Sequence, residues 1–324
     1  MSKSTATYPK LRLGVSACLL GQSVRFDGGH KRDRWVTDVL GAYAEWVPVC
    51  PEMEIGLPSP RPTLRLVARI DGTTRLFMPK KGQDLSTEME DFAADRVEAL
   101  KEERLAGFVL KAKSPSCGMS RVKRYHDERL PDRSGVGLFA RALAERLPAL
   151  PLEEEGRLHD PRIRENFVTR IFAYGRWLEM EGQGITTSRL MRFHQRHKLQ
   201  LMARSAVGTK RLGNLLGTAA KGVCTQTLAD SYLTLFTTVM RRIPSVSGHT
   251  NVLQHVQGYV SKHITDDDRG HLTRLIGCYR EGLVPLIVPI TMLNHHVRCV
   301  GVPYMDDQLY LSPHPPQMML LNHV

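Results

Sequence analysis

The sequence predicts an α/β domain, with a mostly parallel sheet and helices on both faces, followed by an all-α domain. Up to residue 152, strand-like apolar runs alternate with helical segments, a pattern typical of a parallel sheet covered by helices. Beyond that point the apolar residues follow helical spacing alone. We therefore expect two domains, 1–152 and 153–324, and the prolines and glutamates of LPALPLEEEGRLHDP favour a linker between them.

Three cysteines of the first half, Cys18, Cys50 and Cys117, each follow a short apolar run. The runs are LRLGVSAC, AEWVPVC and LAGFVLKAKSPSC, and each predicts a buried strand that ends in a turn. Residues 85–104 are rich in Glu, Ala and Leu and predict a helix that begins near Ser86. Ligands gather beyond the carboxyl ends of strands in an open α/β sheet, so the three thiols can converge on one point.

The second half is predicted to be helical throughout. One helix carries Phe167, Ile171, Tyr174 and Leu178; a second starts at Thr187/Ser188 and continues through RLMRFHQRHKLQLMARS; a third carries Val252, Val256, Tyr259 and Val260; a fourth runs from the acidic cap Asp266–Asp268 to Gly282. These starts and stops match the residue preferences of helix termini. The Pro-rich tail LSPHPPQ is expected either to pack on these helices or to lie loose.

Composition narrows the class of protein. The 324 residues are 42% hydrophobic, and 45 basic against 33 acidic residues give a formal charge of +12, which favours anionic partners such as nucleotides or RNA. No apolar stretch approaches the roughly 20 residues that span a bilayer, and the N-terminus lacks the apolar core of a signal peptide. We expect a cytoplasmic protein with no membrane partner, whose six cysteines remain thiols.

The spacing of the cysteines leaves two interpretations open. No CxxC pair is present, which argues against a structural zinc finger and a thioredoxin-like redox pair. The three cysteines can be small packing residues, a common fate of free Cys. Each, however, is flanked by turn-forming and polar residues rather than lying inside an apolar run. Three soft ligands without an evident fourth would give a metal centre with an open position.

The cysteine segments resemble a known family. GVSACLLGQSVRFDGG, VPVCPEMEIGLPSPRP and KAKSPSCG are similar to the thiouracil desulfidases (TudS type) over residues 10–148, and FHQRHKLQLMARS and HTNVLQHVQGYVSKHI are similar to the YbgA-like domain. The resemblance implies a [4Fe-4S] cluster held by Cys18, Cys50 and Cys117, with one open iron. It also implies removal of sulfur, without net redox change, from a thiolated pyrimidine base, nucleoside or nucleotide.

Proton transfer in such a reaction needs further side chains. Glu52, two residues after Cys50, is a candidate general base, and the resemblance favours it; alternatively it caps a following helix. Ser114 is a candidate proton relay, with Ser116 in reserve as a substrate-binding residue. Both serines can instead simply hold the turn before Cys117.

Substrate contacts are predicted at three further positions. Asp27, in an Asp-Gly turn, can meet the pyrimidine edge or the ribose, or can serve the turn alone. Arg25 and Arg61 can meet a substrate phosphate, or each can be a surface charge. Arg61, in PSPRP, has the more rigid setting.

Other functions remain open at this point. The helical half can grip RNA through its basic residues, and the cluster can sense oxidants without turnover; an iron–sulfur or zinc hydrolase of an unrelated substrate is a third possibility. In this half we expect Cys224, Cys278 and Cys299 to be packing residues, and His194 and His197 to form hydrogen bonds in a polar seam. A homo-oligomer is also possible.

Overall fold

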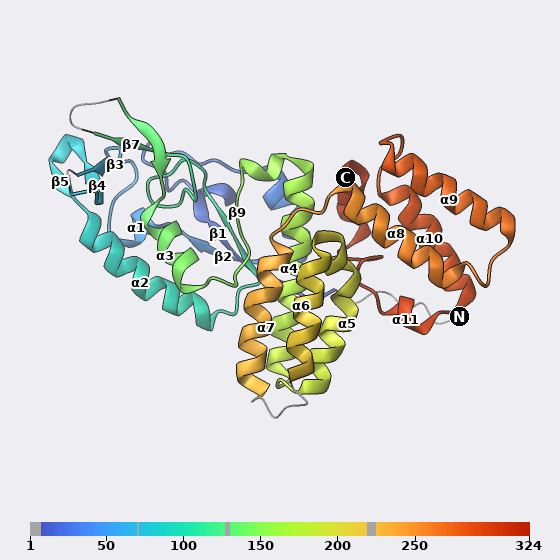
Figure 1. Ribbon diagram of the computed structural model, residues 1–324. Coiled ribbons are helices and arrows are strands. Elements are labelled where there is room, and N and C mark those ends of the chain that lie inside the picture. The colour runs from blue at the N-terminus through green and yellow to red at the C-terminus, as the bar shows by residue number, and fades with distance from the viewer. Residues whose placement is uncertain (1–7, 70, 127–129, 219–224) are drawn as a thin grey trace. The chain divides into compact units, whose positions relative to one another are not determined.

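The computed structural model describes residues 8–69, 71–126, 130–218 and 225–324 (Figure 1). The chain divides into two compact units, Lys10–His159 and Asp160–Val324, with Tyr8 and Pro9 belonging to the second. The glutamates of the predicted linker therefore lie inside the first unit. No helix in these described ranges is long and apolar enough to cross a membrane.

The first unit is built on a four-stranded sheet with the order β2-β1-β6-β9. Its strands are β1 (Leu11–Ser16), β2 (Ala44–Val49), β6 (Gly107–Leu110) and β9 (Leu152–Glu154). All three neighbouring pairs are parallel, which confirms the predicted parallel sheet. The outer strand β9 is formed by the segment predicted to be a linker.

Close packing at the centre of this sheet depends on small and apolar residues. Leu11, Leu13 and Val15 of β1 have no exposed surface. Gly14 lies so close to Phe108 of β6 that a Cβ atom at position 14 would be 2.1 Å from the Phe108 ring. That aromatic ring therefore packs directly over the backbone of β1.

Helices cover this sheet. They are α1 (Pro51–Glu54), α2 (Ser86–Glu102) and α3 (Leu138–Arg146). Short 3₁₀ or π turns are formed by residues Ala17–Leu20, Trp35–Val39, Leu40–Tyr43, Pro79–Lys81 and Arg157–His159. The helix predicted over 85–104 is confirmed as α2. The ring of Phe139 in α3 packs on Phe92 of α2 and Phe108 of β6, with centroids 6.3 and 5.9 Å apart, so both helices share one core with the sheet.

A second sheet of five short strands was not predicted. Its order is β5-β4-β3-β7-β8, formed by β3 (Arg65–Ala68), β4 (Thr74–Met78), β5 (Gln83–Asp84), β7 (Val122–Tyr125) and β8 (Asp132–Gly135). Only β3 and β7 pair in parallel; the other neighbours are antiparallel. Leu66, Leu76 and Met78 form part of its buried core.

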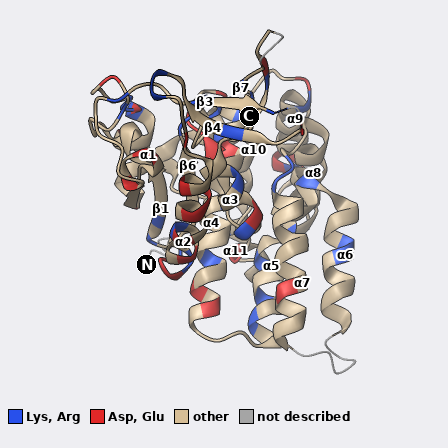
Figure 2. Cartoon of the chain, turned by 90° about the vertical axis from the view of Figure 1, so that its left-hand side faces the viewer, with Lys and Arg blue, Asp and Glu red and all other residues tan. Residues whose placement is uncertain are grey.

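The second unit is helical, as predicted. Its helices are α4 (Pro161–Gly182), α5 (Thr187–Arg204), α6 (Ala206–Gly217), α7 (Thr225–Met240), α8 (Val246–Val260), α9 (Asp266–Arg280), α10 (Ile287–Val300) and α11 (Pro303–Asp306), with 3₁₀ turns at Pro316–Met318 and Leu320–His323. The four predicted helices correspond to α4, α5, α8 and α9, whereas α6, α7 and α10 were not identified from the sequence. Basic residues recur along α5 (Figure 2).

Polar caps fix where these helices begin. Asp160 accepts hydrogen bonds from the Arg162 and Ile163 amides at the start of α4. Thr186 caps α5 in the same way, one residue before the predicted cap, and Thr265 caps α9. Each cap satisfies amides that have no partner within the helix.

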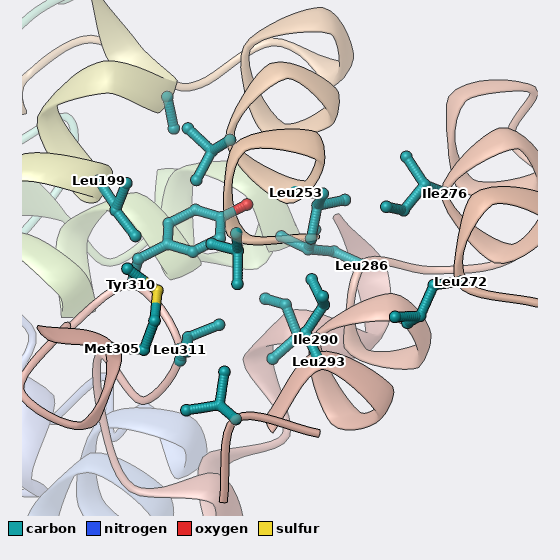
Figure 3. Close-up of a cluster of buried hydrophobic side chains, with 14 of the residues drawn as sticks. Leu199, Leu253, Leu272, Ile276, Leu286, Ile290, Leu293, Met305, Tyr310 and Leu311 are labelled. Carbon is teal, nitrogen blue, oxygen red and sulfur yellow. The ribbon is translucent and has the colours of Figure 1, made fainter. Parts of the chain in front are cut away.

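The core of the second unit includes the tail of the chain. Leu253 of α8, Leu272 of α9 and Leu293 of α10 pack in one cluster with Tyr310 and Leu311 (Figure 3). The Pro-rich tail is therefore packed on the helices rather than loose.

Candidate active site

A cavity of about 350 Å³ in the first unit contains all three predicted cysteines. Its lining comes from four separate stretches of the chain: Ser16–Cys18, Val24–Phe26 with Lys31, Val49–Glu52 with Arg61, and Lys111–Cys117. The predicted convergence of the three thiols is therefore seen in the structure.

The sheet brings the cysteines together. Cys18 lies in the 3₁₀ turn that follows β1, and Cys50 directly follows β2. Cys117 lies seven residues beyond the end of β6, on a loop that returns to the sheet edge. Because β2, β1 and β6 are adjacent and parallel, their carboxyl ends open on the same edge.

Burial raises the pKa of the cysteine thiols that line the cavity. Burial raises the pKa of the Cys18 thiol to about 11, and the neighbouring Lys111 opposes this shift while Cys50 adds to it. Burial also raises the pKa of Cys117, with further upward contributions from Cys18 and Cys50. Free thiols at this site are therefore protonated at neutral pH, so a bound metal would have to displace their protons.

The donor set fits an iron–sulfur cluster. Within the described ranges, no group of three or more His, Cys, Asp or Glu side chains is placed to hold one metal ion. In an iron–sulfur cluster each thiolate binds a different iron, so the ligands need not meet at a single ion. Three cysteines lining one cavity match that requirement.

Glu52 lines the cavity, and each of its carboxylate oxygens accepts hydrogen bonds. Its Oε2 accepts hydrogen bonds from Arg61, at 3.0 Å from Nε and 2.6 Å from Nη2. Its Oε1 accepts a hydrogen bond of 2.6 Å from the Ser116 hydroxyl. Glu52 was alternatively predicted to cap the following helix. That role belongs to Glu54, whose Oε1 accepts a hydrogen bond of 2.9 Å from the amide of Cys50, the residue before α1. Glu52 is thus left for the cavity.

The two predicted serines extend this contact into a chain. Ser114 Oγ and Ser116 Oγ are 3.0 Å apart, and Ser116 donates onward to Glu52. Ser114 also accepts a hydrogen bond from the Cys117 amide at 3.2 Å, so it shapes the turn as well. A path of three oxygen-bearing side chains therefore joins Ser114 to Glu52 along the cavity wall.

The first turn of α3 holds the loop that carries these serines. The Leu138 and Ala140 amides donate to the carbonyls of Pro115 and Ser116, at 3.3 and 3.1 Å. Gly137 must lack a side chain, because a Cβ there would lie 2.4 Å from the Ser116 carbonyl oxygen. The position of Cys117 thus depends on a helix that begins at Leu138, 21 residues later in the sequence.

Glu154 and Glu155, which were not predicted to be site residues, hold the loop that carries Cys117. Glu154 accepts hydrogen bonds from the amides of Met119, at 2.7 Å, and Ser120. Glu155 accepts from the Ala112 amide at 2.6 Å and pairs with the ammonium group of Lys111. Both glutamates are buried, so they tie β9 to the two ends of the Cys117 loop. Their charge suggested exposure, and only the pairing of β9 with β6 reveals their role.

Comparison with known proteins assigns this unit to a family. Residues 13–155 match the family model described as 2-thiouracil desulfurase, and residues 198–315 match a family model of unknown function, DUF1722. The first unit belongs to the 2-thiouracil desulfurase family. All three cysteines, Glu52 and both serines lie within the matched range, and the DUF1722 match covers most of the helical unit.

Individual relatives match parts of the chain. The uncharacterized protein YbgA of Escherichia coli (strain K12) is 28% identical over 154 residues, which are 48% of this chain and 91% of the relative. The uncharacterized protein YbbK of Bacillus subtilis (strain 168) is 28% identical over 109 residues, 32% of this chain and 71% of the relative. A solved structure described as the [4Fe-4S]-dependent thiouracil desulfidase TudS is 31% identical, covers 46% of this chain and 94% of its own, and superposes with a TM-score of 0.38.

The predicted substrate-binding residues of the desulfurase domain lie in different settings. Arg25 lines the cavity and pairs with Asp27, whose Oδ1 also accepts from the Gly29 amide at 3.1 Å. Asp27 is exposed and is not among the described residues that line the cavity. Arg61 is buried and donates to Glu52, Val24 and Pro58, so its guanidinium orients the candidate base. Contact of these residues with a substrate stays a prediction.

Beyond the desulfurase domain, the predicted packing and polar residues of the helical unit follow their local environment. His194 Nδ1 lies 3.0 Å from the Tyr232 hydroxyl, and Nδ1 of the buried His197 lies 2.8 Å from the Phe193 carbonyl, so both form hydrogen bonds as predicted. Their rings, however, pack among Phe193, Tyr232 and Phe236 rather than in a polar seam. Cys278 is partly buried, but Cys299 is exposed, so its predicted packing role was wrong. Cys224 lies outside the described residues.

Proposed function

We propose that the first unit removes sulfur from thiolated pyrimidines by hydrolysis, using a [4Fe-4S] cluster bound by Cys18, Cys50 and Cys117. The observation that carries this proposal is the single cavity that these cysteines share with Glu52 and Ser116. The family match supports the reaction class. In the overall reaction the C=S group and water become C=O and hydrogen sulfide, and no electron is gained or lost.

The cluster would supply one iron without a protein ligand, and such an iron can bind a soft thiocarbonyl sulfur and make its carbon electrophilic. The chain itself would manage the protons. Glu52 is held with one carboxylate oxygen on Arg61 and the other on Ser116. In this position it would accept a proton from the attacking water. Ser116 and Ser114 would carry a proton along the cavity wall.

The cavity also favours an anionic substrate. Arg25, Lys31, Lys111 and Lys113 all line it, and positive groups around a cleft raise the local concentration of anions. A thiolated nucleotide is therefore proposed as a substrate alongside the free base and nucleoside. RNA as a partner and self-association remain predictions from the sequence.

The test is anaerobic reconstitution with iron and sulfide, followed by incubation with 2-thiouracil, 4-thiouracil and their nucleoside monophosphates. We expect about four irons per chain and release of sulfide from at least one substrate. Cys18→Ala, Cys50→Ala and Cys117→Ala should each lose the cluster absorption and the activity, whereas Cys278→Ala should keep both. A fully loaded wild-type protein that releases no sulfide from any of these substrates would overturn the proposal.

A further inference from the structure

Phe26 is an exposed aromatic residue that the proposed proton path does not use. A single exposed apolar side chain needs no explanation by itself. Phe26, however, lines the cavity that holds the three cysteines, and it is the one aromatic residue among the described residues that line it. It therefore offers a ligand in this cavity an aromatic ring on which to stack.

The backbone that carries Phe26 is fixed by hydrogen bonds from Ser59 and Arg61. The Ser59 hydroxyl donates to the Arg25 carbonyl at 2.9 Å. The Arg61 amide donates to the Phe26 carbonyl at 2.9 Å, and Arg61 Nη2 donates to the Val24 carbonyl at 3.0 Å. Three consecutive carbonyls are thus held in place before any ligand binds, and such pre-organisation lowers the entropic cost of binding.

The same segment contacts two of the cysteines. Cys50 Sγ lies 3.9 Å from the carbonyl oxygen of Val24, two residues before Phe26. The amide of Lys31, five residues after Phe26, donates to the Cys18 carbonyl at 2.9 Å. The loop that carries the ring is therefore attached on both sides of Phe26 to residues proposed to hold the cluster.

One face of the ring already has a partner. The guanidinium carbon of Arg25 lies over the Phe26 ring, 5.2 Å from its centroid, and Asp27 pairs with this guanidinium group at 3.2 Å. A cation–π contact of this kind uses one face of an aromatic ring. Phe26 is still 39% exposed with the contact in place, so the ring retains area for a second partner.

The cavity suits a small ligand with a flat apolar face and a polar edge. Its volume of about 350 Å³ is at the lower end of the range for ligand pockets. Val24, Pro51 and Pro115 add apolar wall to that of Phe26, whereas Glu52 and Ser116 supply polar groups. A pyrimidine has both features, because its ring has a π face that stacks on aromatic side chains and its edge forms hydrogen bonds.

We propose that Phe26 stacks on the pyrimidine ring of the substrate and so selects flat thiones over related thioamides whose rings are puckered. This inference rests on the proposed function, because it concerns the same cavity. Stacking would fix the plane of the base and hold its reacting carbon in one orientation relative to Glu52. Phe26 would thus be a substrate-binding residue that moves no proton.

Phe26→Leu in the full, iron-loaded chain tests this role, because it removes the ring and keeps an apolar side chain. The KM for 2-thiouracil or 4-thiouracil and the inhibition constant of uracil should rise by about 5- to 150-fold, as expected for loss of one stacked base. Iron content should not change, and Phe26→Tyr should behave as the wild type. The control is Tyr259→Leu, which removes an aromatic residue that is 37% exposed in the helical unit. Wild-type constants in Phe26→Leu would overturn the inference and leave the proposed function standing.

A pair of ligands separates stacking from a general structural effect. 2-Thiouracil and 5,6-dihydro-2-thiouracil share the thiocarbonyl group and its neighbouring N–H groups, but the dihydro ring is not planar. The wild type should bind 2-thiouracil more tightly than the dihydro compound, and Phe26→Leu should reduce this preference at least fivefold. Equal weakening of both ligands would overturn the inference.

Fluorescence keeps the inference testable if the wild type releases no sulfide, the result that would overturn the proposed function. Phe26→Trp places an indole at the cavity wall, and its emission is read after subtraction of the three tryptophans of the wild type. Uracil and 2-thiouracil should quench this emission with a saturable dependence on concentration, whereas Tyr259→Trp should show no saturable quenching. A Phe26→Trp signal that neither ligand quenches saturably would overturn the inference.

Discussion

The Ser116 hydroxyl donates a hydrogen bond of 2.6 Å to Glu52, although 64 residues separate the two in the chain. Each residue lies two positions or fewer from a cysteine of the cavity: Glu52 follows Cys50, and Ser116 precedes Cys117. The bond therefore joins the β2 end of the site to the loop beyond β6. Disturbing either partner should affect proton transfer before it affects the fold.

Glu52→Gln should lower the rate of sulfide release roughly a hundredfold to ten-thousandfold, the range typical for loss of a general base. The amide keeps the size of the side chain but cannot accept the proton. Iron content should stay unchanged, because Glu52 is not a proposed ligand. Turnover and iron are measured on the same preparation, with the exposed Glu102→Gln as control. Wild-type turnover in Glu52→Gln would rule out the proposed base.

Arg61→Met should destabilise the first unit by about 3–5 kcal/mol, because it leaves the Glu52 carboxylate without its buried partner. The Arg61 side chain is only 2% exposed in this pair. The matched control is Arg141→Met, which breaks an ion pair with Glu90 whose side chains are 41% and 50% exposed. That change should cost about 1 kcal/mol or less. Urea unfolding of both variants measures the difference, and equal losses would contradict the prediction.

Gly137→Ala should loosen the Cys117 loop. The added Cβ would meet the Ser116 carbonyl oxygen at 2.4 Å, and relieving such overpacking typically costs about 1–3 kcal/mol. We expect lower stability together with a lower yield of reconstituted cluster. Gly156→Ala is the control, since its Cβ would find its nearest neighbour at 3.6 Å, an ordinary contact. Full iron loading of Gly137→Ala would show that the loop can move without affecting the cysteines.

The helical unit should lose stability as the pH falls from 6.5 to about 4. Burial lowers the pKa of His249 to about 4, with Glu165 opposing the shift and Arg204 and Arg162 adding to it. An unfolded histidine titrates near 6.5. Between these values only the unfolded state binds the proton, so each pH unit costs about 1.4 kcal/mol for this group. The contribution is fully present above pH 6.5.

Urea unfolding followed by circular dichroism at intervals across this pH range measures the slope. His249→Gln should reduce the slope of stability against pH by the contribution of one proton, about 1.4 kcal/mol per pH unit. His271→Gln, which changes an exposed histidine, should leave the slope as in the wild type. If His249→Gln shows the wild-type slope, another group is responsible for any loss of stability in acid.

The predictable parts of the fold are those in which the apolar pattern of a short segment directly reflects its burial in the folded unit. β1 and β6 are apolar because they are central in the sheet, and the edge strand β2 ends in the buried Val47 and Val49, so the sequence around Cys18, Cys50 and Cys117 revealed both the strands and the convergence of their ends. α2 was recognisable from its composition.

Other features could not be read locally because their partners are distant. Arg61 and Glu52 are nine residues apart, yet nothing in PSPRP shows that its arginine turns inward. Glu154, the last residue of β9, and Glu155, the next residue, receive their hydrogen bonds from Met119 and Ala112, which lie 35 and 43 residues away. A buried carboxylate is stable when it is paired and hydrogen-bonded, and such pairing becomes visible only when the chain is folded.

The position of β9 decides how this protein can be divided. A fragment ending at Leu152, where the composition changes, would lack Glu154 and Glu155, which bind the two ends of the Cys117 loop. Such a fragment should be partly or wholly unfolded. A fragment that extends through His159 contains the whole first unit and keeps both glutamates. To study the function of each unit separately, the chain should be divided between His159 and Asp160, after the three glutamates.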